Sequence, residues 1–193
     1  LNVEPKLSLE ALASPPEAID NHFIDAVLTE HSSGLRLLAA QTQLGSQKHV
    51  SAKTVIHILN LIASRFENVM IDLPRAWYDW TDDVLLGADR LFLISDGSVP
   101  AIRAAKRQMV EYSQRYAGKV IPLIIVNKQA RGLFAASLSD RDLASSFGDQ
   151  YAGSISDDTA IAREAINRGI PISAVNSRSR LINDLGRILS GLK

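Results

Sequence analysis

From residue 68 onward the sequence alternates between short apolar runs and amphipathic helical segments, and this alternation limits the fold more than any other feature. Runs that are apolar throughout are typical of strands buried on both faces, and intervening helices are typical of a parallel sheet. The sequence therefore predicts an α/β fold, with a mostly parallel sheet and helices on both faces. The expected strands cover residues 68–73, 90–95, 119–127 and 150–155, and the expected helices cover 81–88, 100–116, 139–147, 158–168 and 179–192.

The first 67 residues show the same kind of pattern less regularly. Apolar residues at helical spacing predict two amphipathic helices, at residues 17–30 and 51–65. A short apolar run at 35–40 predicts a buried strand, and the polar stretch at 42–49 predicts an exposed loop.

Composition excludes several classes of function. Lys plus Arg equals Asp plus Glu, at 21 each, so no overall field favours nucleic acid or an acidic membrane as a partner. The longest apolar run, at 120–126, is too short to span a bilayer, and no secretory signal pattern opens the chain. The sequence has no cysteine, which rules out disulfides and thiolate chemistry and fits the reducing cytoplasm.

Two further chemistries lack support. The four histidines show no metal-ligand spacing, and no G-x-S-x-G elbow is present for a hydrolase triad. The chain also contains no G-x-x-x-x-G-K-[ST] loop, so as it stands it is not expected to cradle a triphosphate.

Function in a parallel sheet is expected where its strands end, because ligands bind outside the carboxyl ends of such strands. Asp72 closes the apolar run at 68–73, which is the geometry of a Walker B aspartate that holds Mg²⁺ through water near a γ-phosphate. The alternative is a carboxylate that caps the next helix. A second strand end is Ser95-Asp96-Gly97.

The other strand ends carry amide and carboxylate groups. Asn127, followed by Lys128, offers one acceptor and two donors that match a purine edge, unless it only satisfies loop backbone groups. Asp157 or Asp158 is expected to cap the helix that follows, and the same loop, with Ser156, could instead reach a base or ribose.

Several motifs resemble those of a known superfamily. Residues 66–75 (F-E-N-V-M-I-D-L-P-R) resemble the F-D-x-V-x-x-D-x-P strand of ParA/MinD-type deviant Walker ATPases, and residues 126–128 resemble their base-reading V-N-R/K. Residues 155–158 and 168–171 look like their I-P-x-D and x-G-x-P ending. Within the superfamily, two segments resemble hallmarks of CpaE/TadZ-type pilus assembly proteins. They are residues 33–40 (S-G-L-R-L-L-A-A) and residues 74–81, which end in W-x-x-W-T. The resemblance covers almost the whole chain.

The resemblance implies a P-loop NTPase-like fold of the ParA/MinD type whose N-terminal βα unit is missing here. Residues 1–193 would be the C-terminal part of a single ATPase domain, with the phosphate-binding loop and any receiver-like domain upstream. It implies ATP and Mg²⁺ as cofactors of the full-length protein, and no tight ATP binding by this chain alone. ATP hydrolysis is expected only with an intact phosphate-binding loop.

The resemblance also implies roles for individual residues. Asp72 would be the Mg²⁺ and switch carboxylate, and Asn127, with Lys128 beside it, would face adenine. Ser156, Asp157 and Asp158 would line the base side, with Ser156 at a position where the related ATPases commonly have proline.

The implied function is a nucleotide switch that localises or assembles a Flp/Tad-type pilus secretion system. Its expected partners are a second copy in a homodimer and proteins of the pilus machinery, and its expected location is the cytoplasm at the cell pole. The alternatives are a non-hydrolysing scaffold of the same fold and a cell-division or partitioning ATPase. Trp77, Tyr78 and Trp80 either pack a short helix onto the sheet or form the dimer interface.

Overall fold

The computed structural model describes residues 3–12, 14–41, 50–130 and 138–192. The chain forms two compact units, residues 1–87 and 88–193, and each is described by itself. The predicted exposed loop at 42–49 lies outside the described residues.

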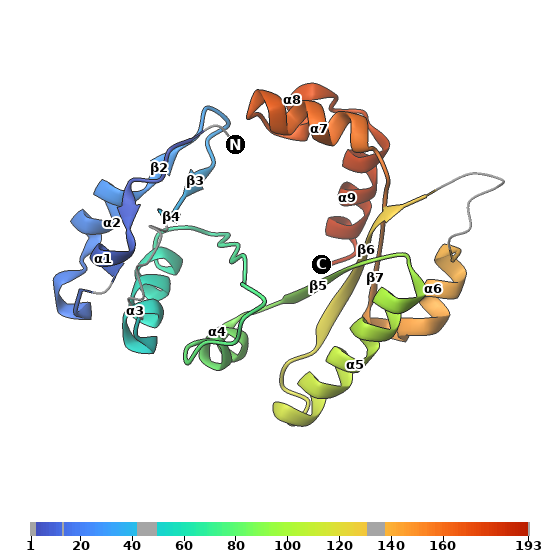
Figure 1. Cartoon of the computed structure of the whole chain (residues 1–193), viewed down its shortest axis with the longest axis horizontal. Helices are drawn as coiled ribbons and strands as arrows, with labels where there is room; N and C mark the ends of the chain where they lie inside the picture. The colour runs from blue at the N-terminus through green and yellow to red at the C-terminus, as the bar shows by residue number, and fades with distance from the viewer. Residues whose placement is uncertain (1–2, 13, 42–49, 131–137, 193) are drawn as a thin grey trace. The chain divides into compact units, whose positions relative to one another are not determined.

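The second unit contains a parallel sheet of three strands. β5 (Leu91–Asp96), β6 (Pro122–Gln129) and β7 (Tyr151–Ser156) lie in this order, with β6 in the middle (Figure 1). β5 and β6 stay in register from Leu91 opposite Pro122 to Asp96 opposite Asn127. The predicted α/β fold with a parallel sheet is confirmed.

Alternate side chains of β6 supply the core on the two faces of this sheet. Ile124 and Val126 pack on one face against α5 (Val99–Arg115) and α6 (Asp140–Phe147). Ile125 packs on the other face, against α9 (Arg180–Ser190). Figure 1 shows α5 and α6 together on one side of the sheet and α9 on the other. The buried residues of these two clusters are Ile102, Ala105, Ile124, Val126, Leu143 and Phe147, and Ile125, Ile155 and Ile188.

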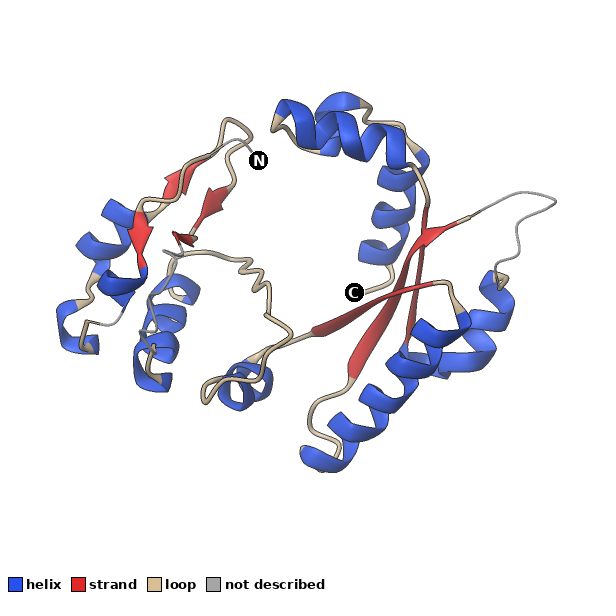
Figure 2. Cartoon of the chain, viewed as in Figure 1, coloured by secondary structure: helices blue, strands red, loops and turns tan. Residues whose placement is uncertain are grey.

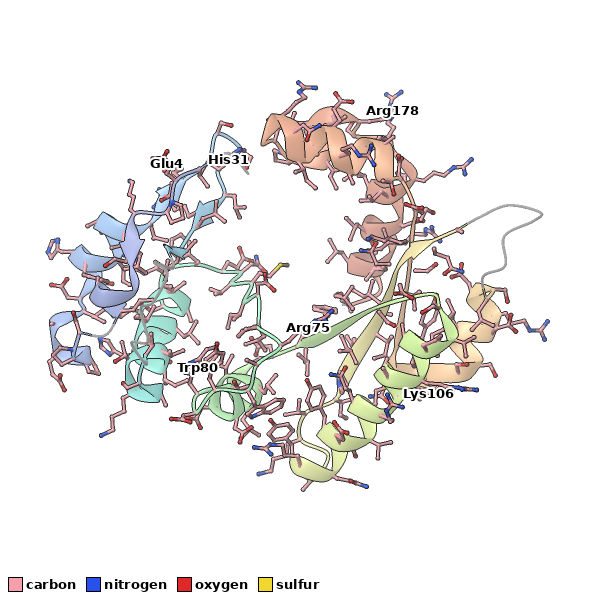
Figure 3. All side chains as sticks on the ribbon, in the orientation of Figure 1. Glu4, His31, Arg75, Trp80, Lys106 and Arg178 are labelled. Atoms are coloured by element: carbon pink, nitrogen blue, oxygen red, sulfur yellow. The ribbon has the colours of Figure 1, made fainter. Side chains whose placement is uncertain are left out.

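Local signals fix the helix ends of this unit. Ser98, Ser139 and Ser179 cap α5, α6 and α9, and Ser139 forms a capping box with Asp142. α7 (Thr159–Arg168) ends at Gly169 in the left-handed region, and the short α8 (Ile172–Val175), which was not predicted, follows. Figure 3 labels Lys106 on α5, whose ammonium lies 5.9 Å from the centre of the Phe147 ring.

The first unit is built mainly from helices and two short strand pairs. Its buried core joins α2 (Asn21–Val27) and the residues beside it to α3 (Ala52–Ala63), through Ile19, Ile24, Leu28, Ile58 and Ile62. The strand pairs are β1 with β4, which are parallel, and β2 with β3, which are antiparallel. The elements are β1 (Leu7–Ser8), α1 (Leu9–Leu12), a 3₁₀ turn (Pro16–Ala18), α2 (Asn21–Val27), β2 (Thr29–Glu30), β3 (Arg36–Leu37), β4 (Ala40–Gln41), α3 (Ala52–Ala63) and α4 (Thr81–Gly87).

Two predictions for this unit need correction at their boundaries. The helix predicted at 17–30 is shorter, because Asp20 accepts a hydrogen bond from the Phe23 N–H and starts α2 only there. The strand predicted at 35–40 is two separate short strands, because β3 pairs back with β2 and β4 pairs with β1. The helix predicted at 51–65 is confirmed as α3.

The strand predicted at 68–73 is wrong for this structure. These residues form a loop between α3 and α4 (Figure 2), in which Met70 is 94% exposed and Val69 and Ile71 are each 40% exposed. A strand needs a neighbour to satisfy its backbone N–H and C=O groups. No strand among the described residues pairs with this segment, so its apolar side chains face solvent although their pattern is that of a buried strand.

Candidate functional site

A bulge in β6 shapes the carboxyl edge of the sheet. Val126 lies opposite Ser154 and Gln129 opposite Ser156, so Asn127 and Lys128 together face one residue of β7. Lys128 has a φ of 55°, in the left-handed region. The Lys128 N–H donates to Asn127 Oδ1 at 2.8 Å, and the amide nitrogen of Asn127 has no acceptor among the described residues. Bulges of this kind redirect side chains beside functional sites.

The end of β5 brings a carboxylate next to this bulge. Asp96 lies opposite Asn127, and its Oδ1 accepts a hydrogen bond of 2.8 Å from the Ser98 N–H. Hydrogen bonds from the hydroxyl and the N–H of Ser98 lower the pKa of Asp96, and the positive charge of Lys128 lowers it further. Asp96 therefore stays ionised at neutral pH beside Lys128.

Gln129 connects three loops at this edge. Its backbone oxygen accepts a hydrogen bond of 3.0 Å from the Asp157 N–H in the loop after β7. Its side-chain nitrogen donates to the Leu138 carbonyl ahead of α6, and its Oε1 faces the turn after β5, 2.6 Å from where a Cβ on Gly97 would lie. Gln129 is only 5% exposed, so its position is fixed by these neighbours.

The two aspartates in the loop after β7 accept different hydrogen bonds. Asp158 caps α7 by accepting from the Ile161 N–H at 3.3 Å, which confirms the capping interpretation for Asp158. Asp157 is exposed and accepts from the Thr159 hydroxyl at 2.6 Å.

Ser156 is directed toward α9. It is 4% exposed, and its N–H and hydroxyl donate to Asp184 Oδ2 at 2.8 and 2.5 Å. Proline has no N–H and could not make the first of these bonds. Serine at this position therefore supplies an N–H to a buried acceptor on α9.

The structure brings most of the predicted site together. Asn127, Lys128, Asp157 and Asp158 lie at the carboxyl ends of β6 and β7, joined there by Ser156. Asp72 belongs to the first unit, where it is exposed in the loop at 68–80.

Sequence reasoning missed three residues with a structural part in this region. Asp96 was noted only as a strand end. Gln129 was overlooked although it directly follows Asn127-Lys128. Asp184, which is 2% exposed, could have been found because it interrupts the apolar face formed by Leu181, Leu185 and Ile188.

Two further features are absent from the described ranges. No group of three or more His, Cys, Asp or Glu side chains there could hold a metal ion. No helix in that part of the chain is long and apolar enough to cross a membrane.

Backbone strain at Lys128 leads to a stability prediction. Glycine adopts a positive φ without the steric cost that a side chain brings, whereas alanine keeps that cost. We expect Lys128→Gly to be more stable than Lys128→Ala by about 1 kcal/mol in urea unfolding. Both variants lose the same charge, so the difference reports the backbone alone. A Lys128→Ala variant as stable as Lys128→Gly would contradict the prediction.

Close packing at Gly97 leads to a second prediction. A Cβ there would overlap Gln129 Oε1, and Gln129 is held by the Leu138 carbonyl, so we expect Gly97→Ala to lower the free energy of unfolding by about 2 kcal/mol. The cost should shrink when Gln129 is also replaced by alanine, in a double-mutant cycle. Gly87→Ala is the control, because nothing lies within 4 Å of its added Cβ. Equal costs at Gly97 and Gly87 would refute the overlap.

No protein-family model matches the sequence. No curated protein matches it significantly either.

Solved structures do match the fold. A ParA family ATPase from Chlorobium tepidum TLS superposes with a TM-score of 0.81 at 15% identity, covering 100% of this chain and 77% of that one. The septum site-determining protein MinD from Pyrococcus horikoshii OT3, complexed with Mg-ADP, gives 0.71 at 15% identity, covering 100% and 75%. A chain of the MinC:MinD cell division protein complex from Aquifex aeolicus gives 0.70 at 19% identity, covering 100% of this chain and 75% of that one. The chain therefore has the α/β fold of the ParA/MinD-like P-loop proteins.

Proposed function

We propose that this chain is the switch and base-binding part of a ParA/MinD-like ATPase that localises or assembles a Flp/Tad-type pilus secretion system. The observation that carries the nucleotide part is the strand-end cluster of Asp96, Asn127, Lys128 and Asp157 in a ParA/MinD-like fold. The pilus part rests on the resemblance of residues 33–40 and 74–81 to CpaE/TadZ-type proteins.

The hydrogen-bond donor and acceptor at this edge of the sheet fit a purine base. Asn127 offers its amide nitrogen as a donor, while its oxygen accepts the Lys128 N–H. Gln129 Oε1 is a buried acceptor without a partner among the described residues. Asn127 would therefore hold the base of ATP, with Lys128, Ser156, Asp157 and Asp158 forming its surroundings.

The phosphate side is assigned to other parts of the protein. We propose that the phosphate-binding loop lies upstream of residue 1, and that Asp72 acts beside it. The Asp72 carboxylate would hold the water ligands of Mg²⁺, and the metal would neutralise charge on the phosphates. Mg-ADP in the MinD from Pyrococcus horikoshii supports this choice of cofactor.

The aromatic segment before α4 supports a homodimer. Trp77 and Tyr78 are 48% and 40% exposed, and the rings of Tyr78 and Trp80 stack with centres 5.3 Å apart. Figure 3 places the Trp80 side chain next to α4. Exposed aromatic residues are typical of interfaces, and this favours the interface interpretation over simple packing.

Calorimetry with the full-length protein tests the nucleotide switch. ATP with Mg²⁺ should bind, and Asn127→Ala should weaken binding about tenfold through the lost hydrogen bond to the base. Asn60→Ala, at an exposed position of α3, is the matched control and should bind as the wild type does. If no nucleotide binds to the full-length protein, the scaffold alternative is supported instead.

Gene deletion tests the cellular role. Loss of the gene should abolish pilus assembly while cell division and plasmid inheritance continue. A defect in division or inheritance with normal pili would support the division or partitioning alternative.

A further inference from the structure

The side-chain amide of Gln129 has a partner on one side only. Its nitrogen donates to the Leu138 carbonyl, whereas Oε1 has no hydrogen-bond partner among the described residues. Gln129 is 5% exposed, so bulk water does not freely take the place of that partner. A buried acceptor without a donor costs free energy, and a donor on a bound molecule would recover it.

The Leu138 carbonyl fixes which way the amide faces. Exchanging the amide oxygen and nitrogen would set two acceptors against each other at Leu138. Oε1 therefore faces Gly97, whose added Cβ would lie only 2.6 Å from it. Because Gly97 has no side chain, this oxygen lies against the backbone of the turn at residues 96–98, at the carboxyl end of β5.

We propose that Gln129 is a specificity-determining residue whose Oε1 accepts a hydrogen bond from the exocyclic amino group of an adenine base. The proposal rests on the proposed function, because it requires a nucleotide base at the ends of β5 and β6. The turn at residues 96–98 covers the oxygen, so the base reaches it only when that turn shifts.

Asn127 supports adenine as the base. Its oxygen accepts the Lys128 N–H, and the described residues offer its amide nitrogen no acceptor, so it presents a donor. Gln129, two residues further along β6, presents an acceptor. Adenine offers a partner to each of them, since its amino group is a donor and the neighbouring N7 is an acceptor.

Bases with a carbonyl oxygen in place of the amino group should be rejected. Guanine and hypoxanthine would set this oxygen against Oε1, leaving two acceptors without a hydrogen between them. A site built to bond an amino group discriminates strongly against an analogue that lacks it, because its own polar group is left unpaired.

The experiment compares ATP with inosine triphosphate in the full-length protein by calorimetry. The wild type should bind ATP at least about tenfold more tightly than inosine triphosphate. Gln129→Met, which keeps the length of the side chain and removes the amide, should bring the ratio close to one. Asn127→Ala should weaken both nucleotides alike, since adenine and hypoxanthine both keep N7 as an acceptor for the Asn127 amide. An unchanged ratio in folded Gln129→Met would overturn the proposal.

If Gln129→Met does not fold, a third nucleotide tests the inference on the wild-type protein. Purine riboside triphosphate carries hydrogen in place of the amino group, and it should bind the wild type about tenfold more weakly than ATP. Equal binding of these two would overturn the inference alone, with the nucleotide switch intact. Failure of the wild type to bind any of the nucleotides would instead refute the proposed function, and the inference with it.

Discussion

Replacing Asp184 with alanine is expected to lower the free energy of unfolding by about 3 kcal/mol. Asp184 is 2% exposed, and its Oδ2 accepts both the N–H and the hydroxyl of Ser156. Its Oδ1 forms an ion pair with Arg187 one turn further along α9. Alanine would leave the Ser156 N–H buried without an acceptor at the point where α9 packs on β7.

Graded substitutions separate the contributions in urea unfolding. Asp184→Asn keeps one oxygen acceptor but loses the charge that pairs with Arg187, and it should cost less than alanine. Ser156→Ala removes only the hydroxyl and should cost about 1 kcal/mol. Asp149→Ala, at an exposed position, is the control and should stay within about 0.5 kcal/mol of wild type. An Asp184→Ala variant as stable as this control would show that the buried contact adds nothing.

The sheet of the second unit was predictable because one strand carries most of its core. Residues 122–126 are apolar at every position, and the structure buries Ile124 and Val126 on one face and Ile125 on the other. The cap of α7 was also predictable, since an aspartate ahead of a helix satisfies its first N–H groups, as Asp158 does.

The segment at 68–73 was not predictable in the same way. Its apolar pattern is that of a buried strand, but pairing depends on a neighbouring strand, which local periodicity does not report. Without a partner strand in the described part of the chain, the Met70 side chain is 94% exposed.

The residues that the site predictions missed form their contacts with residues distant in sequence. Ser156 and Asp184 are 28 positions apart, and Gln129 meets Gly97 only because β5 and β6 are neighbours in the sheet. Asn127 and Asp158, by contrast, act on residues close in sequence, and patterns of residue type were enough to single them out.

Asp72 carries the second large expected effect. If it positions Mg²⁺ and the attacking water, Asp72→Asn should lower the rate of ATP hydrolysis by the full-length protein about 100-fold. ATP binding should change little, because the substitution leaves the proposed base contacts at Asn127 and Gln129 unaltered. The side chain is exposed in the loop between α3 and α4, so the free energy of unfolding should stay within about 0.5 kcal/mol of wild type.

A matched substitution elsewhere makes the result specific to Asp72. Asp89→Asn changes the same functional group at another exposed position, between α4 and β5, and should leave the hydrolysis rate unchanged. Rates are measured as phosphate release at saturating ATP and Mg²⁺, so that a difference in binding does not enter. If Asp72→Asn hydrolyses ATP as fast as Asp89→Asn, the assignment of Asp72 as the switch carboxylate is wrong, and the motif at 68–74 then has another role.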